Sequence, residues 1–505
     1  MKKLARTISG VTPVAVMTLP MKCPGECIYC PTYEATPQSY TPESPAVLRA
    51  IKCGFDARKQ VELRLKVLAQ MGHPTDKIEL IVMGGTFLAY PKDYQYQFIK
   101  DCFDALNGKG STTLEEAKQF NETAKHRSVG LCLETRPDWC GQEEIDRMLS
   151  FGTTRVELGV QTLDDRIYKL VRRGHKVADV VKATKLLREH GFKVHYHWMP
   201  GMPGATPEED LALSIRLFSD AQFRPDGLKL YPTMVVAGTE LEQWYRQGYY
   251  QPYENDTMTA LMASIKAIIP KYVRVSRVLR DIPARFIVAG LKDSLRDVVK
   301  QLMEQQATRC HCIRCREYGH RARDGWEIGK PRLARMDYQA SDGREVVLSF
   351  EDKRGTLFGL LRLRIQPKPV TGLWSETGGN PALIRELHVY GPEVSLGQRK
   401  SAAAQHKGLG KALLKEAERI AAEEFDAGLV AVLSGVGTRE YYRSDFGYNL
   451  EGNYMVKKLN NRLPRVRSVV KTREKGDFAR IDNHLLFFLA PVLHHLFYTL
   501  GKSGA

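Results

Sequence analysis

Short apolar runs alternate with longer helical patterns through the first 231 residues of the chain. Six of the runs have the length and β-rich composition of strands, at residues 14–18, 78–83, 129–134, 155–160, 194–198 and 227–231. The segments between them, such as residues 94–106, 177–190 and 207–221, have the pattern of helices. Six βα alternations predict a parallel sheet, and they are too few for a closed eight-stranded barrel. We therefore expect an α/β fold here, an open or three-quarter (βα)6 barrel.

Glycine and polar residues gather where these predicted strands end. Gly84 and Gly85 follow the second strand, Glu157 lies on the fourth, and Gln161 ends it. The carboxyl ends of parallel strands meet at one rim, where the chemistry of such folds takes place. Glycines let backbone approach a ligand there, and carboxylate and amide groups hold its amine and hydroxyl groups. The pattern favours a binding site at this rim.

Three cysteines follow the first predicted strand and so belong to the same rim. Cys23, Cys27 and Cys30 have three and then two residues between them, and Tyr29 directly precedes the last. Thiolates this close in sequence can hold one metal centre, and three ligands on a four-iron cluster leave one iron open. A zinc knuckle is the alternative, but no fourth cysteine or histidine follows nearby. The C-x3-C-x2-C spacing resembles the signature of radical S-adenosylmethionine (SAM) enzymes, which implies a TIM-like partial barrel.

That resemblance implies roles for residues along the rim. The three cysteines would hold a 4Fe-4S cluster whose open iron chelates SAM, and an electron from the reduced cluster would release a 5′-deoxyadenosyl radical. Gly84 and Gly85 resemble the glycine turn that receives the SAM amino group. Glu157, Gln161 and Arg173 are candidates for the rest of the SAM pocket.

A second cysteine group comprises Cys310, Cys312 and Cys315, with His320 five residues further on. This spacing indicates a structural zinc site. A second redox cluster and free cysteines in a basic linker are the alternatives. The fourth zinc ligand is left open between His320, His311 and a distant residue.

The pattern changes around residue 330. Residues 346–350 and 357–364 predict two antiparallel strands, and residues 382–389 and 429–433 predict two more. Between the last two, Gln405-His-Lys-Gly408-Leu-Gly410 runs directly into a predicted helix at 411–424. A Q-x-x-G-x-G loop at a helix start presents free backbone N–H groups to an anion such as a pyrophosphate. With Tyr441 and Tyr442 downstream, this order of elements resembles the GNAT acetyltransferase fold, which implies acetyl-CoA binding.

The composition of the chain indicates what kind of partner the protein binds and in which compartment it is located. The formal net charge of +17 and the pI near 9.3 favour a polyanion, nucleic acid first, although a basic protein without such a partner is the alternative. Clustered cysteines and the lack of a secretory signal indicate a reducing, cytoplasmic location. No apolar run reaches transmembrane length, so we expect no integral membrane segment. The apolar segment at 485–500 could pack on the enzyme, form a homodimer or lie on a membrane surface.

A radical SAM barrel joined to a GNAT domain makes the resemblance specific. The matching stretches resemble the catalytic subunit of Elongator, a tRNA-modifying enzyme, in its bacterial and archaeal single-chain form. They are CIYCP, IVMGGTF, LETRPDWC, ELGVQ, RRGH, KLYPT, RELHVYG, QHKGLG and GTREYYRSDFGY. The expected domains are a radical SAM domain at 1–300, a zinc-binding linker at 301–330, a GNAT-type domain at 331–459 and a tail at 460–505. The loop between the first two cysteines is shorter than in many relatives.

The family resemblance implies a reaction at the wobble uridine of the tRNA anticodon stem-loop. The radical would abstract a hydrogen from the acetyl methyl group of acetyl-CoA. The resulting carbon radical would add to carbon 5 of uridine, and water would release CoA to leave 5-carboxymethyluridine. Tyr441, with Tyr442 close behind, would donate a proton to the leaving thiolate, and Glu386 is the third catalytic candidate. The expected acetyl-CoA contacts are Lys77, Glu386, Leu387, His388, Gly408, Leu409, Gly410 and Tyr441.

Three other interpretations remain open. The chain could be a protein lysine acetyltransferase whose radical SAM domain is structural, which would need neither SAM nor reductant. It could be a radical SAM enzyme for a small molecule, with the second domain as an acyl-CoA sensor. It could also be a non-catalytic tRNA-binding module, although the intact cysteine triad argues against that.

Overall fold

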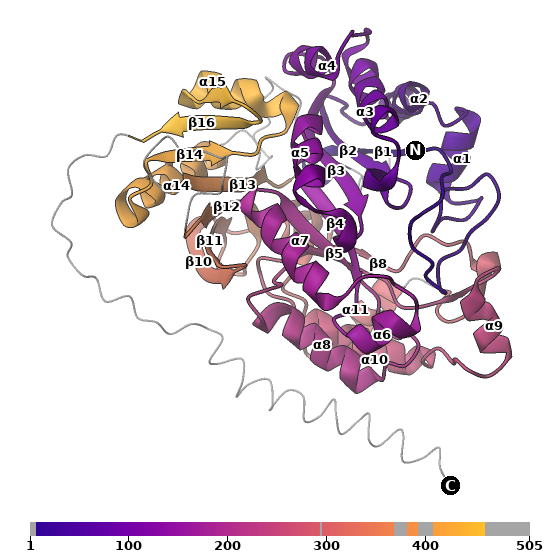
Figure 1. Cartoon of the computed structure of the whole chain (residues 1–505). Coiled ribbons are helices and arrows are strands. Elements are labelled where there is room, and N and C mark those ends of the chain that lie inside the picture. Colours follow the sequence, from indigo (N-terminus) through magenta and orange to yellow (C-terminus); the bar gives the residue numbers. More distant parts are fainter. Residues whose placement is uncertain (1–6, 293–294, 368–380, 392–407, 460–505) are drawn as a thin grey trace.

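The computed structural model describes residues 7–292, 295–367, 381–391 and 408–459 (Figure 1). Its N-terminal part is built on a parallel sheet in the order β1-β2-β3-β4-β5-β6-β8. The strands are β1 (Thr12–Met17), β2 (Lys77–Met83), β3 (Arg127–Thr135), β4 (Arg155–Gln161), β5 (Lys193–Trp198), β6 (Gly227–Leu230) and β8 (Arg274–Val278). The six predicted strands and the open partial barrel are confirmed.

The seventh strand, β8, was not predicted. Only Val275 and Val278 are apolar in its five residues, whereas Arg274, Ser276 and Arg277 line the lumen of the half-barrel. A strand that faces a polar lumen needs no continuous apolar run, so the pattern of the sequence does not reveal it.

Helices cover the outer face of this sheet (Figure 1). The larger ones are α2 (Ala57–Gln70), α3 (Lys92–Asn107), α5 (Gln142–Phe151), α7 (Val177–Glu189), α8 (Pro207–Ser219), α10 (Asn255–Ala267) and α11 (Leu295–Gln305). On β2, Ile78, Leu80 and Val82 are buried in the core, and the residues between them face the lumen. This two-residue period is that of a strand with two different environments on its faces.

The C-terminal part contains a second sheet in the order β10-β11-β12-β13-β14-β16-β15. Its strands are β10 (Arg332–Ala340), β11 (Gly343–Glu351), β12 (Leu357–Ile365), β13 (Pro381–Val389), β14 (Leu429–Val432), β15 (Asn449–Glu451) and β16 (Tyr454–Lys458). Neighbours are antiparallel except the parallel pair β13 and β14. Helix α14 (Leu409–Phe425) packs on β11, β12 and β13. The predicted strands and helix are confirmed here, whereas Gln405, His406, Lys407 and the whole tail lie outside the described residues.

Shorter elements complete the chain. They are α1 (Pro45–Lys52), η2 (Phe87–Ala89), α4 (Leu114–Asn121), η3 (Pro137–Trp139), α6 (Asp165–Leu170), β7 (Val235–Val236), α9 (Glu240–Arg246), η4 (Ala284–Phe286), β9 (Ile287–Ala289), α12 (Ile313–Arg316), α13 (Tyr318–Arg323), η5 (Val436–Thr438) and α15 (Arg439–Phe446). In the described part of the chain, no helix has the length and apolar character needed to cross a bilayer.

The two sheets are joined by a shared core. Leu383 of β13 and Leu429 of β14 belong to the same apolar cluster as the helices of the half-barrel. Next to α15, a Cβ added at Gly435 would lie 2.3 Å from the carbonyl oxygen of Val129 on β3. The second sheet is therefore packed directly against the amino-terminal end of the first one.

Candidate functional site

A cavity of about 740 Å³ occupies the lumen of the half-barrel. All seven strands of the first sheet contribute to its walls, β2 through Glu79, Ile81 and Met83. It begins at the cysteine loop on the carboxyl rim and reaches Glu386 and His388 of β13 in the second sheet. One open cavity therefore connects the cysteine loop with Glu386 and His388, two of the residues expected to contact acetyl-CoA, whereas Tyr441 and the start of α14 do not line it.

The cysteine loop forms the outer end of this cavity. Cys23, Cys27 and Cys30 all line it. Among the described residues, their sulfur atoms do not form a group within 4.8 Å of one another, which a single ion would require. A four-iron cluster takes one thiolate on each of three separate irons, so this wider spacing fits a cluster better than a lone metal ion.

Two arginines lie beside this loop. Arg173 Nη1 donates to Cys27 Sγ at 3.4 Å, and Arg136 lies under the loop at Gly25. Burial by itself raises the pKa of Cys27, but Arg173 and Arg136 outweigh that effect and lower it. Burial and the Cys27 charge raise the pKa of Cys30 to about 12. Of these two cysteines, Cys27 is therefore the one whose negative charge the arginines stabilise most.

The glycine turn after β2 comes close to the same rim. Gly84 and Gly85 have φ values of +140° and +90°, which favour glycine. A Cβ at Gly84 would lie 1.8 Å from Thr18 Oγ1, so the turn is packed against the end of β1. Gly85 lines the cavity, which leaves its backbone available to a ligand.

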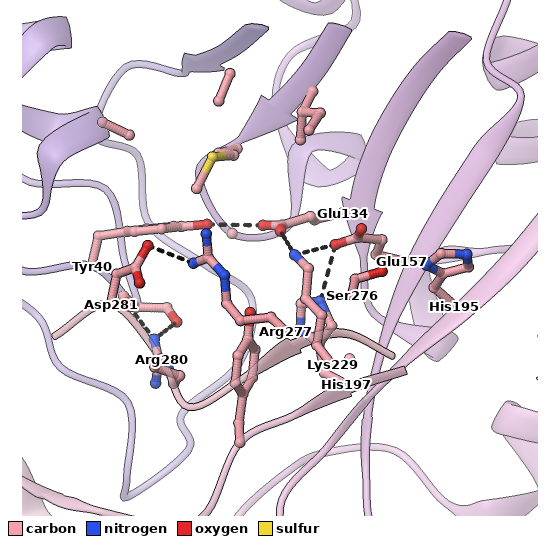
Figure 2. A pocket seen from close by; sticks show the side chains of 18 of the residues that line it. Tyr40, Glu134, Glu157, His195, His197, Lys229, Ser276, Arg277, Arg280 and Asp281 are labelled. Atoms are coloured by element: carbon pink, nitrogen blue, oxygen red, sulfur yellow. Dashed lines mark hydrogen bonds and ion pairs between the residues drawn. The ribbon is translucent and has the colours of Figure 1, made fainter. Parts of the chain in front are cut away.

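Polar side chains converge in the middle of the cavity, as Figure 2 shows. The ammonium of Lys229 lies between Glu134 Oε1, at 2.9 Å, and the carboxylate of Glu157. His197 Nε2 lies 3.2 Å from Glu157, and Tyr40 donates to Glu134 at 2.9 Å. Burial by itself lowers the pKa of Lys229, but the two carboxylates outweigh this and raise it well above its usual value. Lys229 therefore carries a positive charge inside the barrel.

Of the candidate SAM residues, Glu157, Gln161 and Arg173 all line the cavity. Gln161 adopts a left-handed φ of +73° at the end of β4. Lys229 and His197 were missed by the sequence reasoning. The available signal was a lysine or histidine between two outward-facing apolar or aromatic residues of a strand, in GLKL and KVHYHW.

Glu386 and His388 form the inner end of the cavity. Arg362 Nε donates to Glu386 at 2.8 Å, and Lys193 Nζ lies 3.5 Å from the same carboxylate. Burial by itself raises the pKa of Glu386, but Lys193 and Arg362 outweigh it and lower it. Glu386 is therefore ionised and suits accepting a hydrogen bond rather than donating a proton. Leu387 packs against the core of the second sheet instead.

The tyrosine pair divides into one partly buried residue and one core residue. Tyr442 is 5% exposed and belongs to the core of the second sheet. Tyr441 is only partly buried, and its hydroxyl lies 3.3 Å from the position of a Cβ at Gly410, in the first turn of α14. Burial raises the pKa of Tyr441 to about 12, with Asp445 adding to the effect. Tyr441 thus keeps its proton at neutral pH beside the start of α14, where Gly408 and Leu409 also lie.

Lys77 lies far from the cysteine rim. It is the first residue of β2 and pairs in register with Arg127, the first residue of β3. A Cβ at Gly437 would lie 2.4 Å from the Cβ of Arg127. Lys77 is therefore at the end of the barrel on which the segment before Tyr441 packs.

The second cysteine group comes together as the sequence predicts. The sulfur atoms of Cys310, Cys312 and Cys315 lie within 4.8 Å of one another. His320 does not join them in the described structure; its Nε2 lies 3.7 Å from the Glu317 carboxylate. Three convergent thiols offer an ion three of the four ligands of a structural zinc site.

Comparisons with known proteins agree with this geometry. Residues 17–214 match the Radical SAM superfamily, and residues 225–305 match the Radical_SAM C-terminal domain. The chain is 65% identical over 460 residues to the tRNA uridine(34) acetyltransferase of Dehalococcoides mccartyi, covering 91% of this chain and all of that one. It is 41% identical over 475 residues to human Elongator complex protein 3, covering 90% of this chain and 86% of the relative.

A solved structure gives the same result. The archaeal Methanocaldococcus infernus Elp3, with residues 1–46 deleted, superposes with a TM-score of 0.79 at 46% identity, over 90% of this chain and all of that one. A half-barrel with a three-cysteine loop and relatives this similar over nearly the full length leave one conclusion. The chain belongs to the family of tRNA uridine(34) acetyltransferases and Elongator complex protein 3, and it is a radical SAM acyltransferase.

Proposed function

We propose that this enzyme carboxymethylates carbon 5 of the wobble uridine, position 34, in tRNA, with acetyl-CoA as the carbon donor and SAM as the radical source. The observation that carries the proposal is the single cavity that extends from Cys23, Cys27 and Cys30 to Glu386 and His388. A radical generated at the cysteine end and an acetyl group held beside Glu386 and His388 would then meet in the same cavity.

The residues at the outer end suit an iron–sulfur cluster and SAM. Cys23, Cys27 and Cys30 would hold a 4Fe-4S cluster, which when bound supplies the electron that cleaves SAM. The positive-φ turn at Gly84 and Gly85 leaves room for backbone to meet the SAM amino group. In the middle of the cavity, Glu157 and Gln161 offer acceptors for ribose hydroxyl groups.

The start of α14 suits the acyl donor. The first turn of α14, with Gly408, Leu409 and Gly410, offers backbone N–H groups to the pyrophosphate of acetyl-CoA. Tyr441 lies beside this turn and keeps its proton at neutral pH, so it would protonate the departing thiolate. Lys77 would contact acetyl-CoA from the adjoining end of the half-barrel.

Charge and cysteine chemistry support two further parts of the proposal. The net charge of +17 suits the anticodon stem-loop of tRNA, whose phosphates dominate the affinity of such complexes. The three thiols of Cys310, Cys312 and Cys315 would together hold a structural zinc ion next to the second sheet.

The test is an anaerobic reaction of the reconstituted enzyme with reductant, SAM, acetyl-CoA and tRNA, followed by nucleoside mass spectrometry. We expect 5-carboxymethyluridine from the wild type and from Cys53→Ala, a cysteine outside the cavity, and none from Cys27→Ala or Tyr441→Ala. Formation of deoxyadenosine without modified uridine would contradict the substrate assignment and leave the radical chemistry in place. Acetyl-lysine formation that needs neither SAM nor reductant would favour a protein lysine acetyltransferase instead.

A further inference from the structure

The cysteine loop and the turn after α6 are joined by their backbones. The amide of Ile28, next to Cys27, donates to the carbonyl of Val171 at 3.2 Å. The turn itself is tight, because Arg172 has a φ of +53° and the amide of Arg173 donates to the carbonyl of Tyr168 at 2.8 Å. Arg172 lies at the surface, where it pairs with Glu240, and the side chain of Arg173 is directed back at the loop.

Arg173 is fixed in that position on two sides. It is 6% exposed, its Nη1 donates to Cys27 Sγ at 3.4 Å, and its Nη2 donates to the carbonyl of Gly159. Arg136 supports it from behind, because its Nη2 donates to the Arg173 carbonyl at 2.7 Å. The guanidinium that contacts the sulfur is therefore held by the Gly159 carbonyl, and the backbone of Arg173 is held by the Arg136 side chain.

Arg136 adds a second positive charge under the same loop. Asp138 accepts from its Nε and Nη2 at 2.9 and 2.8 Å, while Nη1 is buried without a hydrogen-bond partner. A Cβ added at Gly25 would lie 1.9 Å from this Nη1. The backbone between Cys23 and Cys27 thus rests on the guanidinium, and a buried N–H is directed at the loop.

We propose that Arg173, supported by Arg136, donates an N–H···S hydrogen bond to the Cys27 ligand of the iron–sulfur cluster and thereby raises the reduction potential of that cluster. One-electron reduction adds one negative charge to the cluster. A hydrogen bond to a ligand sulfur and buried positive charges stabilise that added charge, and hydrogen bonds to sulfur are an established determinant of cluster potential. Arg173 is a positioning residue in this role, distinct from a direct contact to SAM. The inference rests on the proposed function in one respect, the presence of the cluster.

The test is a redox titration of the reconstituted cluster in the absence of SAM, acetyl-CoA and tRNA. The EPR signal of the reduced cluster is the readout, and the titration gives its midpoint potential. Arg173→Met is expected to shift the midpoint to more negative values at unchanged iron and sulfide content. Arg173→Gln, which keeps a donor but loses the charge, is expected to shift it less. Arg172→Met, the solvent-facing neighbour, is expected to leave it unchanged.

SAM affinity, measured by equilibrium dialysis on the oxidised protein, separates the two roles of Arg173. An unchanged midpoint with weakened SAM binding in Arg173→Met would overturn the proposal in favour of a SAM contact. If Arg173→Met does not retain its iron, Arg173→Gln decides, and a wild-type midpoint in that variant overturns the proposal. Because no uridine substrate is present, failure of the carboxymethylation assay has no bearing on the result.

Discussion

Arg385 of β13 and Asp226, directly before β6, form a two-pronged ion pair between the two sheets. Nη1 and Nη2 of Arg385 donate to the two carboxylate oxygens of Asp226 at 2.7 and 2.8 Å, and neither side chain is more than 1% exposed. Burial by itself raises the pKa of Asp226, but Arg385, Arg362 and Arg188 outweigh it and hold it well below its usual value. The carboxylate thus neutralises part of a buried cluster of arginines at the domain junction.

Asp226→Asn should therefore be strongly destabilising. It leaves buried guanidinium groups without their counter-charge, and breaking a buried pair in this way costs about 3–5 kcal/mol. Urea unfolding at neutral pH measures the loss. Glu62→Gln, which removes an exposed pair with Arg58, is the control and should cost at most about 0.5 kcal/mol. Equal stability of the two variants would show that the junction does not depend on this pair.

This ion pair also marks the limit of prediction from the sequence. The two residues are 159 positions apart, and no periodicity connects them. The strands were predictable because their outer faces pack on helices and carry apolar residues at every second position. The cysteine loop was predictable because ligand spacing is local.

The middle of the cavity was not predictable in the same way. Lys229 lies between Glu134 and Glu157 only because three strands bring them together (Figure 2). Strand β8 escaped prediction for a related reason, since its inward side chains are polar. Tyr441 and Tyr442 were predicted together, and only the structure distinguishes them, because Tyr442 is buried and Tyr441 is partly exposed.

Tyr441→Phe should lower the formation of modified uridine by about 10²–10⁴-fold, the range typical of a lost general acid. Only the hydroxyl is removed, so the fold and the cluster should be unaffected. Single-turnover assays with acetyl-CoA, SAM and tRNA measure the effect. Tyr442→Phe is the matched control and should keep nearly full activity, because that ring is in the core. A large loss of activity in Tyr442→Phe with little loss in Tyr441→Phe would identify Tyr442 as the proton donor.

Gly25→Ala should impair cluster loading. The added Cβ would overlap Arg136 Nη1, at 1.9 Å, so the loop between Cys23 and Cys27 has to move. Overpacking of this kind costs about 1–3 kcal/mol. Iron and sulfide content after anaerobic reconstitution measures the effect. Gly110→Ala, where the nearest atom is 4.0 Å away, should load like the wild type. Full loading of Gly25→Ala would show that the loop has room to shift.

The second cysteine group, Cys310, Cys312 and Cys315, should bind zinc without His320. Cys312→Ser is expected to lose the ion and to lower the melting temperature, whereas His320→Ala should retain it, because that imidazole faces Glu317 instead. Metal analysis of the purified proteins by mass spectrometry decides the point. Loss of zinc from His320→Ala would show that His320 is the fourth ligand.

Asp210 should make the stability of the wild type fall as the pH rises from about 4 to about 7. This α8 residue is 2% exposed, and burial raises its pKa to about 7 although Gly201 N–H and Tyr253 O–H donate to it. In the unfolded chain the pKa is about 3.9. Between these values the folded protein holds a proton that the unfolded chain has lost, so the stabilisation present at low pH is lost as the pH approaches 7.

Asp210→Asn is neutral at every pH and isolates this contribution. Relative to the variant, the wild type should lose up to about 4 kcal/mol of unfolding free energy across that range, which is about three pKa units at 1.36 kcal/mol each. Urea unfolding of both proteins at pH 4.5, 6 and 7.5 measures the difference. Glu208→Gln, an exposed change on the same helix, should track the wild type. Parallel curves for the wild type and Asp210→Asn would mean that the carboxyl group is already ionised at the lowest pH, and that the bonds from Gly201 and Tyr253 outweigh its burial.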